Sequence, residues 1–265
     1  MPFIEVNHHR LHYHDSHPTG PPPGGQTLLL IHGLGSSQNY YFPILPYLTS
    51  KHRCIALDTY GSGRSAYTGL EFDMTALAAD VAAVLSVLGV TAAIVVGHSM
   101  GGLAVTYLGS LYADLIKGVV AIGPTHPSDA LVSVMTKRAE IVAEDGMESM
   151  ANSIPEAATG SKATPLQKAF IRELILSQNP KGYATLCRLI ASAAPGEYAA
   201  IRAPFLLIAG EEDKSASLAG CEYLFERVGS ANKKMVVLEG VGHWHCIEAN
   251  EEVGGFIADF VDNLA

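Results

Sequence analysis

The sequence is poor in basic residues and has no long apolar run, and both absences narrow the partners it can have. Lysine and arginine number 17 against 26 aspartates and glutamates, which gives a formal net charge of −9. An acidic chain with scattered basic residues is not expected to bind nucleic acid or an anionic membrane surface. No run of 18 apolar residues is present, and the first residues lack the pattern of a secretory signal. We therefore expect a soluble, cytoplasmic protein with neither a nucleic-acid nor a membrane partner.

Cysteine is also scarce, which bears on disulfides. The chain has four cysteines with no paired spacing, and three of them lie inside apolar runs. This pattern is typical of small core residues rather than of a disulfide framework, and it suits a reducing compartment. Histidines crowd the N-terminus at mixed spacings, and we interpret them as part of an exposed hairpin rather than as a metal site. They are His8, His9, His12, His14 and His17.

Short apolar runs indicate the strands of one sheet. The chain has 265 residues, of which 48% are hydrophobic, so it can bury the core of one large α/β domain. Helix-period segments lie between several runs, for example Met74–Leu88, which has Asp73 as a candidate N-cap, and Leu103–Tyr112. Buried strands that alternate with helices predict a mostly parallel sheet with helices on both faces. The strand-like runs are Phe3–Val6, Leu11–His14, Thr27–Ile31, Cys54–Leu57, Ala92–Val96, Gly118–Ile122, Phe205–Ile208 and Met235–Leu238.

The alternation stops between Pro124 and about Pro204. This segment has no strand-like run and is too long for a loop. We interpret it as a helical lid inserted after the sixth strand, so that residues 1–123 and 204–265 form the core and residues 124–203 the lid. The helical patterns inside it are Ser128–Glu144, Gly146–Ser153, Thr164–Leu176 and Lys181–Ala193.

The sharpest catalytic signal is the pentamer Gly97-His98-Ser99-Met100-Gly101, which follows a buried strand and precedes a helical stretch. A serine on so tight a turn needs small residues two positions away on either side, and the two glycines meet that need. The turn lifts the hydroxyl into the cleft and points a helix N-terminus at developing negative charge. We therefore predict that Ser99 is a nucleophile.

A serine hydroxyl needs a base to take its proton, and His243 is the predicted base. It follows the last strand-like run. His245 is the alternative, although it would face the other way if the loop is extended. His98 adjoins the nucleophile in sequence and is expected to point elsewhere, whereas His32 and His126 can lie near the pocket.

The third member of a serine triad orients the imidazole and stabilises its charged form. Asp213 is the predicted residue, because it follows the apolar run at 205–208. Glu211 and Glu212 lie on the same turn and are the alternatives.

An oxyanion hole is the remaining requirement. Residues 31–35 end the third strand in a glycine-rich turn, so the backbone N–H of Leu34 can pair with that of Met100. A base and an oxyanion hole supply what a metal would, so we expect neither a metal nor another cofactor.

These motifs, in this order, resemble the α/β-hydrolase superfamily over nearly the whole chain. The order Ser99, Asp213, His243 is the order of that superfamily. Residues 58–65, Asp-Thr-Tyr-Gly-Ser-Gly-Arg-Ser, resemble its loop after the fourth strand, with Tyr60 where proline or arginine is common. His243 followed by Glu248 resembles a further motif. The resemblance implies an α/β-hydrolase fold, with a mostly parallel eight-stranded sheet flanked by helices and a helical lid after the sixth strand.

Two lid segments add detail. Gly146–Ala151 and Asn179–Tyr183 resemble segments of 3-oxoadipate enol-lactonases and their relatives, a group that includes small esterases and strigolactone and karrikin receptor hydrolases. The resemblance implies a serine hydrolase that cleaves a small carboxylic ester or lactone through an acyl-enzyme. A hydrolase-derived ligand receptor with slow turnover and a carbon–carbon bond hydrolase are the alternatives, because both keep the same triad.

The lid and the motif loops supply the expected substrate contacts. A lid with few charges favours a small, mostly apolar ester or lactone as the small-molecule partner, whereas the oligomeric state leaves no signal. The residues expected to bind substrate are His32, Phe42, Trp244, Met135, Met147 and Phe170.

Overall fold

The eight predicted strands form one sheet in the computed structural model, which describes residues 2–264. The strand order is β1-β2-β4-β3-β5-β6-β7-β8. β2 is antiparallel to both β1 and β4, and every other pair is parallel. The strands are β1 (Phe3–Val6), β2 (His9–Asp15), β3 (Thr27–Ile31), β4 (Arg53–Leu57), β5 (Ala93–His98), β6 (Ile116–Ile122), β7 (Phe205–Gly210) and β8 (Lys233–Leu238). The predicted α/β fold is confirmed.

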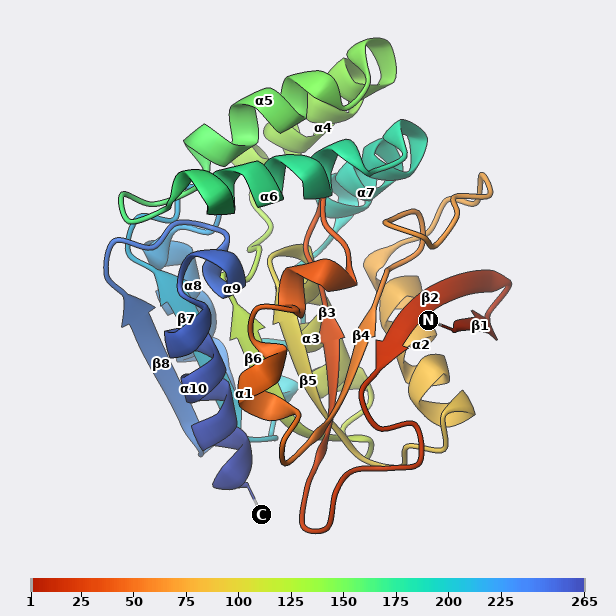
Figure 1. Ribbon diagram of the computed structural model, residues 1–265, viewed down its shortest axis with the longest axis vertical. Coiled ribbons are helices and arrows are strands. Elements are labelled where there is room, and N and C mark those ends of the chain that lie inside the picture. Colours follow the sequence, from red (N-terminus) through yellow and green to blue (C-terminus); the bar gives the residue numbers. More distant parts are fainter. Residues whose placement is uncertain (1, 265) are drawn as a thin grey trace.

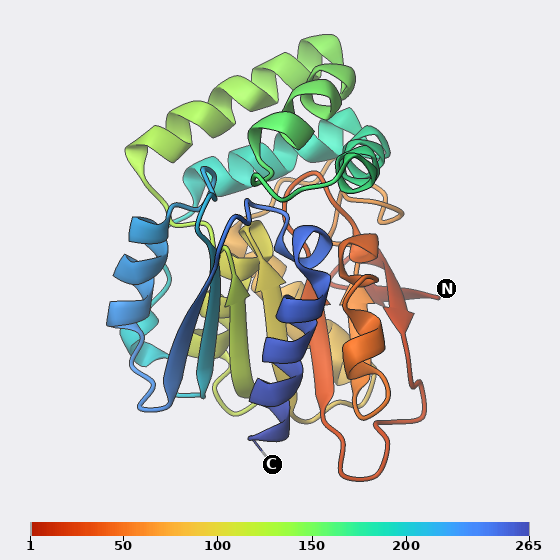
Figure 2. The same ribbon diagram turned by 60° about the vertical axis from the view of Figure 1, so that its left-hand side comes forward.

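Helices cover both faces of the sheet (Figures 1 and 2). This is why β3, β4, β5 and β7 are buried along their whole length and consist almost entirely of apolar residues. α1 and α10 lie on one face, and α2, α3 and α8 lie on the other (Figure 1). The helices outside the lid are η1 (Gln38–Tyr41), α1 (Leu45–Leu48), α2 (Met74–Val87), α3 (Met100–Leu111), η2 (Tyr198–Ala200), α8 (Leu218–Arg227), α9 (His245–Glu248) and α10 (Asn250–Asp262). Asp73 caps α2 as predicted, since its side chain accepts the Ala76 N–H at 2.7 Å.

The N-terminal hairpin is tighter than predicted. Val6 pairs directly with His9, so only Asn7 and His8 form the turn. Both have positive φ, 46° and 71°, as a two-residue turn of the type that matches strand twist requires. The second strand therefore begins two residues before the predicted start at Leu11.

The prediction of exposed N-terminal histidines is wrong for His9 and His12. The His9 ring is 6% exposed and its Nδ1 lies 2.5 Å from Asp80 Oδ2, while His12 is 1% exposed with Nδ1 2.8 Å from Asp58 Oδ2. Both carboxylates come from segments far along the chain. Each imidazole is buried because it has a carboxylate partner there.

Four helices lie together above the carboxyl ends of the parallel strands (Figure 1). We call them the lid; they are α4 (Asp129–Asp145), α5 (Glu148–Ala157), α6 (Pro165–Leu176) and α7 (Pro180–Ser192). Ser128, Thr164 and Asn179 cap α4, α6 and α7 through their side chains. The lid is thus the predicted helical insertion after β6.

The lid approaches the core most closely where glycines replace side chains. A Cβ on Gly182 of α7 would lie 2.2 Å from the Gly61 carbonyl oxygen, and one on Gly160 would lie 2.3 Å from the Gly240 oxygen. Neither contact leaves room for a side chain. The two backbone contacts seat the lid on the strand ends.

Two further features bear on the sequence expectations. All four cysteines are buried and free of disulfides. Within residues 2–264 no helix is both long and apolar enough to cross a membrane. The cytoplasmic location stays a prediction.

Candidate active site

Ser99 occupies a strained turn between β5 and α3. Its φ is 55° and its ψ is −114°, a conformation that a non-glycine residue seldom adopts. A Cβ on Gly97 would lie 2.0 Å from the Gly101 carbonyl oxygen, and one on Gly101 would lie 2.0 Å from that of Ile31. Both glycines are therefore required by the close approach of strand, turn and helix.

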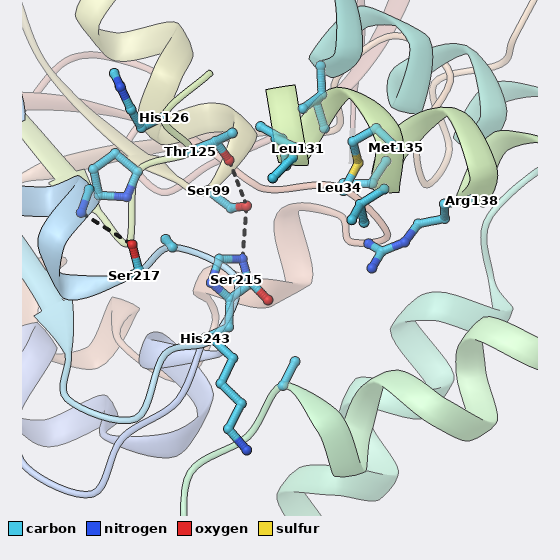
Figure 3. Close-up of a pocket in the computed structure, with 18 of the residues that line it drawn as sticks. Leu34, Ser99, Thr125, His126, Leu131, Met135, Arg138, Ser215, Ser217 and His243 are labelled. Carbon is cyan, nitrogen blue, oxygen red and sulfur yellow. Dashed lines mark hydrogen bonds between the residues drawn. The ribbon is translucent and has the colours of Figure 1, made fainter. Parts of the chain in front are cut away.

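Three side chains that the sequence separates meet in one line at this turn. The Ser99 Oγ lies 2.9 Å from His243 Nε2, and His243 Nδ1 lies 2.8 Å from Asp213 Oδ2 (Figure 3 shows the first contact). The serine hydroxyl can donate to Nε2 when Nδ1–H donates to the carboxylate. His243 comes from the loop after β8, and Asp213 from the turn after β7.

The Asp213 carboxylate is buried but well supplied with donors. Its Oδ1 accepts the backbone N–H groups of Ser215 and Ala216 at 2.7 and 2.8 Å. Burial acts to raise the pKa of Asp213, but the charge and hydrogen bond of His243 outweigh it, so the pKa of this carboxyl lies below its usual value. Asp213 is therefore ionised at neutral pH.

Glu211 and Glu212, the alternatives for this role, point elsewhere. Glu211 accepts the Gly240 N–H at 3.0 Å. Glu212 accepts the backbone N–H and the hydroxyl of Ser161 at 2.8 and 2.6 Å, in the loop between α5 and α6. One carboxylate thus supports the loop after β8, and the other ties the core to the lid.

Two further imidazoles hold the backbone of His243. Its carbonyl oxygen lies 2.7 Å from His98 Nε2 and 2.9 Å from His245 Nδ1. A carbonyl only accepts, so both ring nitrogens carry hydrogen. His98 and His245 are deeply buried, and burial lowers the pKa of both, that of His245 to about 4, so both rings are neutral. The loop is not extended at this point, since α9 begins at His245, and His245 Nε2 remains 4.0 Å from Asp213 Oδ2.

The proposed oxyanion donors lie on either side of the serine. Met100 is the first residue of α3, and Leu34 lines the pocket. Neither backbone N–H has an acceptor within residues 2–264. Gly33 brings the Leu34 turn close to Ser99, because a Cβ there would lie 2.8 Å from Ser99 Cβ. Two unpaired donors in this arrangement can bind a developing oxyanion.

A cavity of about 700 Å³ opens in front of Ser99, between the strand ends and the lid. This volume is typical of small-molecule sites. Of the residues expected at the site, Leu34, Ser99, His243, Trp244 and Met135 line it, whereas Met100 and Asp213 lie behind this surface.

Four residues expected to bind substrate lie outside the lining. His32 is fully buried, with Nδ1 donating to the Gly33 carbonyl at 2.7 Å and Nε2 accepting the Thr59 N–H at 3.1 Å. Phe42 packs against His14, with ring centroids 5.2 Å apart. Met147 is buried in the apolar core, and Phe170 is partly buried against it. Proximity in sequence and helical spacing, the two signals that predict these residues, do not say which way a side chain faces.

Other lining residues were missed by sequence reasoning. Thr125 Oγ1 lies 3.3 Å from Ser99 Oγ, and the Thr125 N–H donates to the Ser99 carbonyl at 3.1 Å. Its position just after β6, at the same sheet edge as the other strand ends, was the available signal. Arg138 and Tyr183 enter the cavity from α4 and α7. Tyr183 ends one of the two lid segments that carry the family resemblance, whereas no sequence feature points to Arg138.

Comparison with known proteins agrees with this architecture. A family model described as alpha/beta hydrolase fold matches residues 26–250, and the chain belongs to the α/β-hydrolase family. A curated relative named "Putative carbamate hydrolase RutD", from Caulobacter sp. strain K31, is 26% identical over 96% of both chains. 3-Oxoadipate enol-lactonase 1 of Acinetobacter baylyi is 25% identical over 92% of this chain and 91% of its own.

Solved structures show the same likeness. The enol-lactonase from Burkholderia xenovorans LB400 matches with a TM-score of 0.89 and 26% identity, over 98% of this chain and 99% of its own. A thermophilic esterase from Thermogutta terrifontis shares the fold with a TM-score of 0.88 at 23% identity, over 97% of this chain and 94% of its own. The chain is thus an α/β-hydrolase with esterase-type and lactonase-type neighbours.

Proposed function

We propose that the protein is a serine hydrolase that cleaves a small carboxylic ester or lactone. The observation that carries the proposal is the continuous line from Ser99 Oγ through His243 to Asp213, with contacts of 2.9 and 2.8 Å, at the wall of a cavity. The serine is close enough to the imidazole for proton transfer, and the buried carboxylate fixes the imidazole tautomer.

The first half-reaction forms an acyl-enzyme. Ser99 Oγ attacks the substrate carbonyl carbon while His243 Nε2 takes the hydroxyl proton. The carbonyl electron pair moves onto oxygen, where the Leu34 and Met100 N–H groups stabilise it. The carbon–oxygen bond of the ester then breaks, and His243 returns the proton to the departing alkoxide. In a lactone the alcohol stays attached to the acyl chain.

The second half-reaction releases the acid. His243 takes a proton from water, whose oxygen attacks the acyl carbon, and the tetrahedral intermediate collapses to expel Ser99 with that proton. Asp213 stays ionised throughout and stabilises the imidazolium. No step calls for a metal or another cofactor.

A labelling experiment tests the nucleophile. We expect a fluorophosphonate probe to form one adduct, on the peptide that carries Ser99, and Ser99→Ala to lose p-nitrophenyl acetate hydrolysis by about 10³-fold or more. Ser217→Ala, a serine of the same cavity, is the matched control and should retain labelling. Full activity in Ser99→Ala would reject the assignment.

A second pair of variants tests the base. His243→Ala should abolish turnover, whereas retained activity in His243→Ala together with loss of activity in His245→Ala would reverse the assignment.

The turnover rate with lactones separates an enzyme from a ligand receptor. The receptor hypothesis requires slow hydrolysis and a ligand-dependent shift in melting temperature.

A further inference from the structure

A second hydroxyl lies beside Ser99, and neither proposed half-reaction uses it. Thr125 Oγ1 lies 3.3 Å from Ser99 Oγ (Figure 3). Thr125 is 7% exposed and lines the cavity, in the segment that leads from β6 to the lid helix α4. Within residues 2–264 its hydroxyl has no hydrogen-bond partner other than Ser99. A polar group buried to this extent needs a partner, so the contact with Ser99 sets the direction of the hydroxyl.

The position of Thr125 is fixed by the backbone. Its N–H donates to the Ser99 carbonyl at 3.1 Å, and the Ser99 N–H donates to the Ile122 carbonyl at 3.0 Å. The end of β6 and the turn that carries Ser99 are therefore joined on both sides of the serine. Helix α3 packs against the same segment, because a Cβ on Gly102 would lie 2.8 Å from the Pro124 Cα. None of these contacts involves the Thr125 side chain, so a change of that side chain leaves them in place.

The hydrogen atoms around Ser99 can be assigned from their partners. His243 Nδ1 lies 2.8 Å from the Asp213 carboxylate, which only accepts, so Nδ1 carries the hydrogen and Nε2 is the acceptor. Ser99 has one hydroxyl hydrogen, and it points to Nε2 at 2.9 Å. Thr125 is then the donor to Ser99 Oγ. A separation of 3.3 Å is long for a bond between two hydroxyls, so this bond is weak in the resting protein.

The same bond strengthens when Ser99 reacts. As His243 takes the hydroxyl proton, negative charge builds on Ser99 Oγ, and a hydrogen bond to a charged oxygen is shorter and stronger than one between neutral groups. In the acyl-enzyme, Oγ is a neutral ester oxygen and a poorer acceptor. Negative charge returns to Oγ when its bond to the acyl carbon breaks in the second half-reaction. A donor that gains strength only in the transition states lowers both barriers.

We propose that Thr125 adds a catalytic residue to the triad: its hydroxyl donates a hydrogen bond to Ser99 Oγ while the bond between Oγ and the acyl carbon forms and breaks. This inference rests on the proposed hydrolase function. Thr125 keeps its own proton throughout, and His243 carries every proton that moves. The role differs from that of the Leu34 and Met100 N–H groups, which bind the carbonyl oxygen of the substrate. Because Oγ is the nucleophile in one half-reaction and the leaving group in the other, both depend on Thr125.

Removal of the hydroxyl at nearly constant shape tests the proposal. Thr125→Val should lower kcat and kcat/KM for p-nitrophenyl acetate by about 5- to 50-fold, with KM changed less than about twofold, because both half-reactions slow together. Thr125→Ser keeps the hydroxyl and should retain at least about a third of the wild-type rate. Thr106→Val is the matched control and should keep that rate, since it removes a buried hydroxyl that donates within α3, to the Leu103 carbonyl at 2.7 Å. Wild-type kinetics in Thr125→Val, or an equal loss in Thr125→Ser, would overturn the proposal.

The rate of covalent labelling isolates the attack by Ser99. A fluorophosphonate reacts with Oγ and needs no water, so its second-order labelling rate should fall in Thr125→Val by the same factor as kcat/KM. The opposite result is a slower release of the acyl group alone, seen as a larger burst of p-nitrophenol with labelling at the wild-type rate. It would mean that Thr125 contacts the attacking water instead of Oγ, and it would overturn the proposal.

Labelling of the wild-type protein separates this proposal from the hydrolase on which it rests. A labelled Ser99 with unchanged rates in Thr125→Val rejects the role of Thr125 and keeps the hydrolase. An unlabelled Ser99 with hydrolysis intact in Ser99→Ala rejects both. Thermal melting of Thr125→Val and Thr125→Ser should match that of the wild type, since the backbone hydrogen bonds remain. A loss of rate that follows a fall in Tm in both variants would indicate a packing role and overturn the proposal.

Discussion

The floor of the cavity and its roof are built from different parts of the chain. We call floor the turns after β5, β7 and β8 that carry Ser99, Asp213 and His243, and roof the lid side chains such as Met135 and Arg138. The floor is fixed by backbone contacts too close for a side chain, whereas the roof consists of side chains from the faces of helices. In the proposed function the floor carries the reacting groups, and the roof contacts the rest of the substrate.

One loop joins the two regions. The His243 N–H donates to the Ala158 carbonyl of the lid at 2.8 Å. The Glu248 carboxylate accepts three backbone N–H groups, from Gly160 at 2.7 Å, Gly242 at 3.0 Å and Trp244 at 2.8 Å. The first of these donors belongs to the segment between α5 and α6, and the other two flank His243. The position of the proposed base thus depends on the lid as well as on the sheet.

The largest expected effect comes from the floor. Asp213→Asn should lower kcat by about 10³- to 10⁴-fold, because an amide no longer stabilises the imidazolium and favours the wrong tautomer of His243. KM for a small neutral ester should change little. Steady-state kinetics on p-nitrophenyl acetate measure both. Glu212→Gln, a neighbouring carboxylate that contacts Ser161, is the control and should keep kcat within about threefold. A fully active Asp213→Asn would remove Asp213 from the proposed triad.

The second effect tests the junction between floor and roof. Glu248→Ala leaves three backbone N–H groups without their carboxylate, so we expect kcat to fall by about 10- to 100-fold and the free energy of unfolding by about 2–4 kcal/mol. Urea denaturation and kinetics measure the two quantities. Glu251→Ala, an exposed acid of α10, serves as the matched control. A loss of stability without any loss of kcat would mean that the loop holds His243 unaided.

A third, smaller effect tests the carbonyl contacts of His243. His245→Leu removes one of two N–H donors to that carbonyl, and we expect about a tenfold lower kcat at unchanged KM. Asn can place its amide N–H where His245 has Nδ1–H, so His245→Asn should restore most of the rate. This rescue separates a positioning role from simple loss of packing, which thermal melting of both variants also reports. Equal rates for leucine and asparagine would argue against the hydrogen bond.

The smallest expected effect is on stability alone, and it comes from a residue outside both the floor and the roof. Asp73→Ala removes the N-cap of α2, and we expect unfolding to become easier by about 1 kcal/mol. Neither kcat nor KM should change.

Thr164→Ala removes the N-cap of α6 in the lid at a similar cost in stability, and it should raise KM because the roof becomes less ordered. If Thr164→Ala leaves KM as unchanged as Asp73→Ala does, the order of the roof does not limit substrate binding.

Much of the fold could be predicted because its signals are local. The apolar strands and the capped helices depend on neighbours a few residues away. The burial of His9 and His12 could not be predicted, because the partners Asp80 and Asp58 lie 71 and 46 residues further along the chain. Helical spacing likewise predicts Met147 and Phe170 at the cavity, although neither lines it and both pack with the apolar core.

The sequence by itself determined the residues proposed to react. Ser99 and Asp213 follow the buried strands β5 and β7, and His243 follows the more exposed strand β8. The carboxyl ends of parallel strands meet at one edge of the sheet, so the predicted strands were enough to place the three residues together. Only the tertiary structure decided what surrounds them: the Thr125 hydroxyl, the two imidazoles on the His243 carbonyl, and Arg138 in the roof. The direction of a helix face is set by what the helix packs against, and a pattern within one segment does not carry that information.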